Sequence, residues 1–185
     1  MLKSVLGRCA LTLLIASAAG CSHGKATADT TAAKPEAKAV DYKTITPPDL
    51  VKQTPKGQLK NPYQDTQADI VADGQHLFLS YGCNGCHGGG GGGGMCPPLI
   101  NDTWVYGGDD DTLFRLVTLG SDALQKEGYT RIGQENVVGP MPPFGGIIKS
   151  ADDLWRILAF VRSKYAGDPQ YKFGAPPAPP PPSGE

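Results

Sequence analysis

The sequence lacks three features that would define broad classes of protein. Its apolar run from Leu11 to Ala19 is too short for a permanent spanning helix, which needs about 20 residues. Its five cysteines leave no even set for a disulfide framework once their positions are considered. Residues 61–185 hold eight basic against fourteen acidic side chains, a net charge of −6, so the basic face that nucleic-acid binding requires is missing.

The first 20 residues have the pattern of an export signal of the lipoprotein type. Lys3 and Arg8 precede the apolar run, and small residues lead to Cys21 in the order Ala-Ala-Gly-Cys. We expect Cys21 to carry a lipid after cleavage, with a plain signal peptide cut nearby as the alternative. Both interpretations predict a location outside the cytoplasm, and the first predicts a periplasmic protein held to a bacterial membrane by its lipid anchor only.

The remainder divides by composition into three parts. Residues 21–65 are rich in Ala, Thr, Lys and Pro and poor in large apolar side chains, so we expect a flexible tether, with an extended strap from Tyr42 to Tyr63. Residues 66–168 are expected to form the single folded domain. Residues 169–185 are expected to form a Pro-rich tail outside the core.

Apolar spacing within the domain predicts three main helices. They cover residues 66–80, 109–120 and 150–165, the last capped by Ser150. The seven glycines of residues 88–94 predict an irregular, mobile surface loop, and residues 125–146 predict a loop that wraps another group. Three or four helices with long loops make a poor core by themselves, so we expect a large apolar group in the middle.

The motif Cys83-Asn-Gly-Cys86-His87 is the signature of covalent haem attachment. Two thiols three positions apart can reach the two vinyl groups of one haem, and the next residue presents an imidazole to the iron. A thioredoxin-like redox pair would need a preceding strand, which the pattern does not indicate. A zinc site would need two further ligands at finger-like spacing, which the sequence does not offer.

An electron-transferring haem needs a sixth, strong-field ligand. The candidates are Met95 on the glycine loop, His76 on the first helix, His23 in the tether and Met141 within the motif GPMPPFG. We favour Met141, because its flanking prolines and glycines predict a stiff, extended loop just before the last helix. Haem carboxylates must be neutralised or hydrogen-bonded when buried. Trp104, Tyr106 and Arg115 are the candidate donors to them.

From about Asp69 to Tyr165 the chain resembles a class I cytochrome c in the order of its motifs. The resemblance implies an all-α fold with three to four helices around one covalent haem c, and His87 and Met141 as the iron ligands. It also implies that Pro97 accepts a hydrogen bond from His87 and that Leu99 packs on the haem. Gly74 and Phe78 are implied to cross Trp155 and its neighbours.

Cys96 departs from this family pattern, which has glycine at that position. We expect it to be a small buried apolar residue, with a lipid, disulfide or redox role as the alternatives.

The finer pattern from Met95 to Gly107, together with GPMPPFG, is similar to cytochromes that accept electrons from pyrroloquinoline quinone (PQQ) alcohol dehydrogenases. This implies a one-electron carrier, not an enzyme, that passes electrons to another cytochrome or an oxidase. Two alternatives remain open. One is a fixed subunit of a larger membrane respiratory complex, and the other is a five-coordinate haem peroxidase or gas sensor.

Overall fold

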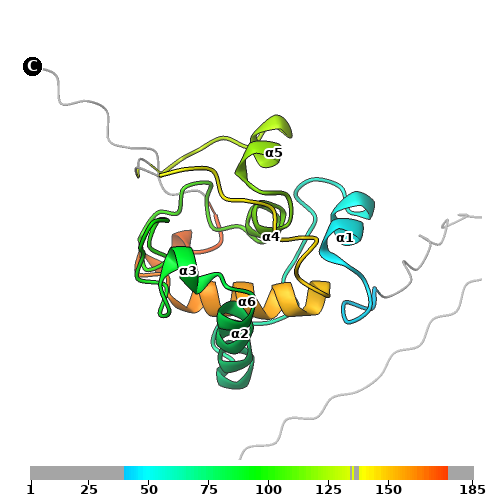
Figure 1. The fold of residues 1–185 in the computed structure, drawn as a ribbon, viewed down its shortest axis with the longest axis horizontal. Helices are drawn as coiled ribbons and strands as arrows, with labels where there is room; N and C mark the ends of the chain where they lie inside the picture. Colours follow the sequence, from blue (N-terminus) through cyan, green and yellow to red (C-terminus); the bar gives the residue numbers. More distant parts are fainter. Residues whose placement is uncertain (1–39, 134, 136–137, 175–185) are drawn as a thin grey trace, which may run out of the picture. The chain divides into compact units, whose positions relative to one another are not determined.

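The computed structural model describes residues 40–133, 135 and 138–174. The signal segment, Cys21, His23 and the last eleven residues lie outside this range. Over the described residues the chain forms helices and loops without strands, and no helix there is long and apolar enough to span a membrane (Figure 1). The α-helices are α1 (Pro47–Gln53), α2 (Ala68–Ser80), α3 (Asn84–His87), α4 (Asp110–Leu119), α5 (Ser121–Lys126) and α6 (Ala151–Ser163), followed by the 3-10 turn η1 (Pro169–Tyr171).

The crossing of α2 and α6 is the central contact of the fold (Figure 1). A Cβ atom on Gly74 would lie 2.0 Å from the carbonyl oxygen of Arg156, so only glycine allows the two backbones to approach this closely. One turn further on, the rings of Phe78 and Phe160 pack with centroids 5.2 Å apart. The crossing therefore occurs as the resemblance implied: Gly74 meets Arg156, the residue next to Trp155, and Phe78 meets Phe160. The ring of Trp155 itself packs on Phe114 of α4.

The expected helix starts at α4 and α6 are present. Asp109 accepts a hydrogen bond from the Thr112 amide at 2.9 Å, and the Ser150 hydroxyl accepts one from the Asp153 amide at 3.1 Å. The loop expected from residue 125 begins later, because Ser121–Lys126 forms helix α5 directly after α4.

The extended strap expected between Tyr42 and Tyr63 is wrong in part, because α1 lies within it. Thr46 caps this helix and Pro47 occupies its first turn, a local signal for a helix start that low apolar content had obscured. Leu50 and Leu59 are almost completely buried in the core. The folded unit therefore begins before residue 66.

The Pro-rich tail also begins later than expected. Pro169–Tyr171 forms η1, and Lys172 makes an ion pair with Asp65. The Lys172 carbonyl lies so close to Gly108 that a Cβ there would approach it to 2.4 Å. Residues 169–174 thus pack on the domain.

Candidate haem site

The cysteine pair and His87 sit on a single helical turn that follows α2. The chain reverses at Gly82, whose φ is +77°, and the Cys83 amide donates to the carbonyl of Phe78 at 3.1 Å. The His87 amide then donates to the Cys83 carbonyl at 3.1 Å, which closes the turn of α3. Because positions three and four apart share a helix face, the thiols of Cys83 and Cys86 and the imidazole of His87 project together.

Two thiols in this region, those of Cys83 and Cys96, have raised pKa values. Burial raises the pKa of Cys83 to about 11. Burial, together with the neighbouring Cys86, also raises the pKa of Cys96 to about 11. Redox-active and metal-binding thiols instead have lowered pKa values. The environment of Cys83 therefore counts against the thioredoxin-like interpretation. Cys96 is a free thiol and only partly buried, so it is less enclosed than the small buried residue expected at this position.

The orientation of His87 is set by a backbone carbonyl. Its Nδ1 lies 2.9 Å from the carbonyl oxygen of Pro97. A carbonyl can only accept, so Nδ1 is the donor, and in the neutral imidazole Nε2 keeps its lone pair. This is the arrangement that makes an imidazole a well-aligned metal ligand.

The glycine loop, residues 88–94, fixes the position of that carbonyl. The Gly93 amide donates to the His87 carbonyl at 2.9 Å, and the Leu99 amide donates to the Gly91 carbonyl at 2.7 Å. Gly91 is buried with φ of +78°, and a Cβ there would lie 3.3 Å from the Leu99 side chain. The loop is irregular, as expected, but it is hydrogen-bonded to the attachment turn and packs on the segment that carries Pro97.

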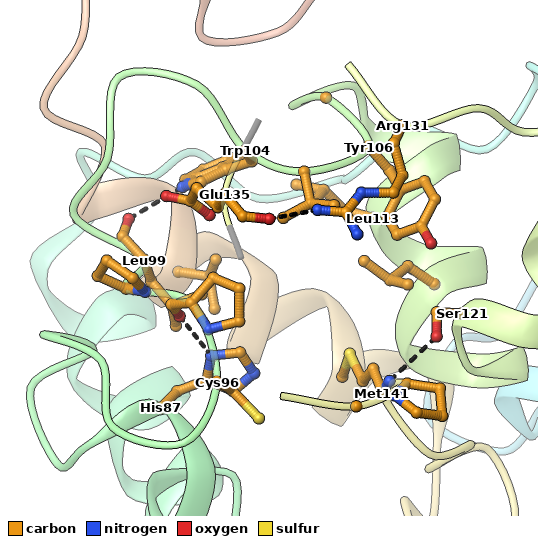
Figure 2. Close-up of a pocket in the computed structure, with 18 of the residues that line it drawn as sticks. His87, Cys96, Leu99, Trp104, Tyr106, Leu113, Ser121, Arg131, Glu135 and Met141 are labelled. Atoms are coloured by element: carbon orange, nitrogen blue, oxygen red, sulfur yellow. Dashed lines mark hydrogen bonds between the residues drawn. The ribbon is translucent and has the colours of Figure 1, made fainter. Parts of the chain in front are cut away.

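A cavity of about 330 Å³ opens beside the imidazole (Figure 2). This volume is within the usual range of sites for small organic groups, roughly 300–1,000 Å³. Its walls are mainly apolar and come from the segment after the glycine loop, from α4 and from α6; they include Pro97, Pro98, Leu99, Trp104, Leu113, Leu116 and Val161.

Met141 lies on the side of the cavity that faces His87 (Figure 2). Its thioether and the imidazole are separated by the open space of the cavity. Of the expected iron ligands, the structure therefore brings a nitrogen donor and a sulfur donor to facing sides of one apolar pocket.

Comparison with known proteins agrees with this geometry. Residues 69–161, half of the chain, match the family described as cytochrome c oxidase, cbb3-type, subunit III. The chain belongs to this family. It is a class I c-type cytochrome with an all-α fold and one covalently bound haem c, and it transfers electrons instead of acting as an enzyme. The expectations of fold, cofactor and general activity are confirmed.

Two solved structures are also similar to the cytochrome. Cytochrome cL from the marine methylotrophic bacterium Methylophaga aminisulfidivorans is 23% identical, with a TM-score of 0.45 over 66% of this chain and 77% of the other. Cytochrome cL from Hyphomicrobium denitrificans is 24% identical, with a TM-score of 0.37 over 62% of this chain and 65% of the other. None of the curated proteins compared with the chain matches it.

Two other candidates for the sixth ligand, Met95 and His76, do not line the cavity. Met95 is 63% exposed on the glycine loop, and His76 is exposed on α2. His23 is outside the described residues.

The three candidate donors to the haem carboxylates have different positions. Trp104 and Tyr106 line the cavity, but the Trp104 indole N–H donates to the Leu99 carbonyl at 3.0 Å. Arg115 does not line the cavity. Its guanidinium is buried against Asp111 and donates to the carbonyl of Thr54. The helical periodicity of α4 does not show whether the long side chain of Arg115 points into the cavity or toward Asp111 and Thr54.

Sequence reasoning missed Arg131, the arginine that does line the cavity, and its neighbour Glu135. Arg131 donates to the Glu135 backbone carbonyl (Figure 2). Oxygen Oε2 of Glu135 is buried without a partner, and burial raises the pKa of this carboxyl group. No spacing signal marks either residue, because both lie in a loop without period.

The residues present suit a haem. The ring requires apolar walls, which the cavity supplies, and its two carboxylates require donors or cations, of which Arg131 is one at the cavity. The iron would need protein donors, and the imidazole of His87 and the thioether of Met141 lie on facing sides of the cavity.

Proposed function

We propose that the cytochrome is an exported one-electron carrier whose haem is bonded to Cys83 and Cys86 and whose iron is ligated by His87 and Met141. The observation that carries this proposal is the pair of facing donors: an imidazole oriented by the Pro97 carbonyl at 2.9 Å and a thioether across an apolar cavity. With His87 and Met141 both holding it, the iron would be closed to external ligands, which suits electron transfer over gas binding or peroxidase chemistry.

The bound haem supplies a reversible one-electron Fe(III)/Fe(II) couple, and the chain supplies its environment. Pro97 holds the imidazole and increases its basicity through the bond at Nδ1. The thioether of Met141 and the low-polarity walls favour the reduced state and so raise the potential. Arg131 provides a positive charge at the cavity for a haem carboxylate. No bond of a substrate changes in this process.

The spectrum of the ferric protein tests the ligation. The wild type is expected to show the far-red band of methionine-to-iron ligation, and Met141→Ala is expected to lose it. Met95→Ala is the matched control and should retain the band, because that side chain is exposed on the glycine loop. Retention of the band in Met141→Ala would refute the assignment, and its absence from the wild type would favour a five-coordinate haem.

We further propose that electrons arrive from a quinoprotein dehydrogenase of the PQQ type and leave to a downstream cytochrome or oxidase. The support is the motif pattern from Met95 to Gly107, together with GPMPPFG. The net charge of −6 over residues 61–185 favours a donor with a basic docking face. Reduction by such a dehydrogenase should be fast at low salt and slow markedly as ionic strength rises. A rate insensitive to salt would contradict charge-guided docking.

The location proposed is the periplasm, with Cys21 as a lipid anchor. The support is the signal pattern of residues 1–20 and the small residues before this cysteine. Cell fractionation tests it: Cys21→Ala should move the haem protein from the membrane fraction to the soluble periplasmic fraction. Equal distribution of wild type and variant would count against lipidation.

A second candidate is a fixed subunit of a membrane respiratory complex, and the family match favours it specifically, since the family is described as an oxidase subunit. Extraction in mild detergent distinguishes the two. A mobile carrier is recovered alone, whereas a fixed subunit migrates with further haem proteins of a complex.

A further inference from the structure

At the junction between α4 and α5, Ser121 forms hydrogen bonds with both the amide and the carbonyl of Met141. The Ser121 amide donates to the Met141 carbonyl at 3.0 Å, and the Met141 amide donates to the Ser121 hydroxyl at 3.0 Å (Figure 2). Ser121 is 6% exposed, so water does not compete freely for either bond. A single residue thus pairs with both polar backbone groups of the proposed ligand.

The same loop is fastened to the end of α4. The last carbonyls of a helix have no partner within it. Here the Val117 carbonyl accepts from the Phe144 amide at 2.9 Å, and the Thr118 carbonyl accepts from the Gly145 amide at 3.1 Å. With the two bonds at Ser121, four hydrogen bonds connect residues 141–145 to residues 117–121.

Close packing at Gly120 leaves this loop little freedom. A Cβ there would lie 2.7 Å from the Met141 carbonyl oxygen and 2.9 Å from the Pro143 nitrogen. The loop backbone therefore rests directly on the junction, and Ser121 is the side chain that bonds it there.

We infer that Ser121 is a positioning residue that keeps the thioether of Met141 at the iron. The inference rests on the proposed ligation by Met141. A ligand whose backbone is already held at the correct place loses little freedom when its side chain binds, so the bound state is favoured over a detached one. Ser121 acts only through Met141 and does not touch the iron.

Competition with imidazole measures this directly. Imidazole binds the ferric iron only while Met141 is detached, so its apparent affinity is reduced by the fraction of protein in that state. Removing the hydroxyl costs one hydrogen bond and leaves the Met141 amide unpaired. In Ser121→Ala we therefore expect the apparent dissociation constant of imidazole to fall about five- to tenfold.

Ser163→Ala is the matched control. Its hydroxyl is also partly buried, but it donates to the Phe160 carbonyl of its own helix, away from Met141. We expect its imidazole affinity to stay within about twofold of the wild type. An equal tightening in this control would show that general destabilisation is responsible and would overturn the inference.

The Met141→Ala background completes the test. This variant should bind imidazole much more tightly than the wild type, and adding Ser121→Ala should change nothing further. A further tightening in the double variant would mean that Ser121 acts on the cavity independently of Met141. Tight binding in Met141→Ala with wild-type binding in Ser121→Ala would overturn the inference alone, whereas unchanged binding in Met141→Ala would overturn the proposed ligation itself.

Discussion

The two sides of the haem cavity are held by different kinds of contact. The His87 wall, residues 83–99, is closed by backbone hydrogen bonds within one short stretch of chain. The Met141 wall, residues 117–121 and 141–145, joins segments about 20 positions apart. A local loop costs less entropy to close than a distant one.

This difference predicts an order of opening. The His87 wall depends mainly on its own glycines and carbonyls. The Met141 wall depends on α4, which must first be held against the rest of the domain. Local opening should therefore detach Met141 before it disturbs His87.

The anchor of α4 is a buried network around Asp111. Arg115 donates to this carboxylate at 2.9 Å, Tyr129 at 2.5 Å and the Leu59 amide at 3.2 Å. Burial on its own raises the pKa of Asp111, but these hydrogen bonds outweigh it, so the pKa lies below its ordinary value. The network ties α4 to the segment after α1.

Among the substitutions considered, breaking this network should cause the largest loss of stability. Asp111→Asn is expected to lower the free energy of unfolding at pH 7 by about 4 kcal/mol, because the buried Arg115 loses its close counter-charge at 2.9 Å and keeps only the more exposed Glu127 at 3.9 Å. Since the folded pKa of Asp111 is depressed, its stabilisation is present above pH about 3.9 and is lost as pH falls through the folded value. Denaturant unfolding at pH 7 measures the loss of stability in the variant, and unfolding at pH 3 measures how much of the wild-type stabilisation is lost in acid.

In acid the wild type should lose the methionine band before it loses histidine ligation, whereas Asp111→Asn should show a weakened band already at neutral pH. The exposed Asp69→Asn serves as control and should stay within about 0.5 kcal/mol. Simultaneous loss of both ligands would contradict the order of opening.

A smaller effect is expected from Gly120→Ala, which displaces the Met141 wall directly. The φ of this residue is +78°, and the added Cβ would meet the Met141 carbonyl oxygen at 2.7 Å. The conformational strain costs about 1–2 kcal/mol and the clash a similar amount, giving about 3 kcal/mol together. The methionine band should weaken while the haem stays attached.

Gly57→Ala separates the two causes. Its φ is +83°, but a Cβ there meets nothing within 4 Å. In Gly57→Ala, backbone strain should therefore lower the stability without a clash, and the methionine band should stay intact. If both variants behaved alike, the close approach at Gly120 would have no part in holding Met141.

Sequence patterns located the His87 wall far better than the Met141 wall. The attachment motif and the helix cap at Ser150 depend on neighbours within a few residues, which a pattern can reveal. The contact of Pro97 with His87 was implied by the family resemblance. The pairing of Ser121 with Met141 depends on how two segments fold onto each other, and no local spacing encodes it. The prediction that Arg115 would bind a haem carboxylate was wrong, because this side chain pairs with Asp111 four positions away and donates to Thr54, which lies 61 positions away.

The smallest changes in the free energy of unfolding are expected from alanine substitutions in the glycine loop, where two glycines should respond differently. Gly91→Ala places a Cβ 3.3 Å from Leu99 at φ of +78° and should cost about 2 kcal/mol, mainly through backbone strain. Gly90→Ala meets nothing within 4 Å and lacks a positive φ, so it should be neutral or slightly stabilising, because alanine lowers the entropy of the unfolded chain. Denaturant unfolding of both variants decides the matter. Because the strain falls on the His87 wall, imidazole competition should be unchanged in both variants, and a tighter imidazole complex in Gly91→Ala would show that the two walls are mechanically coupled.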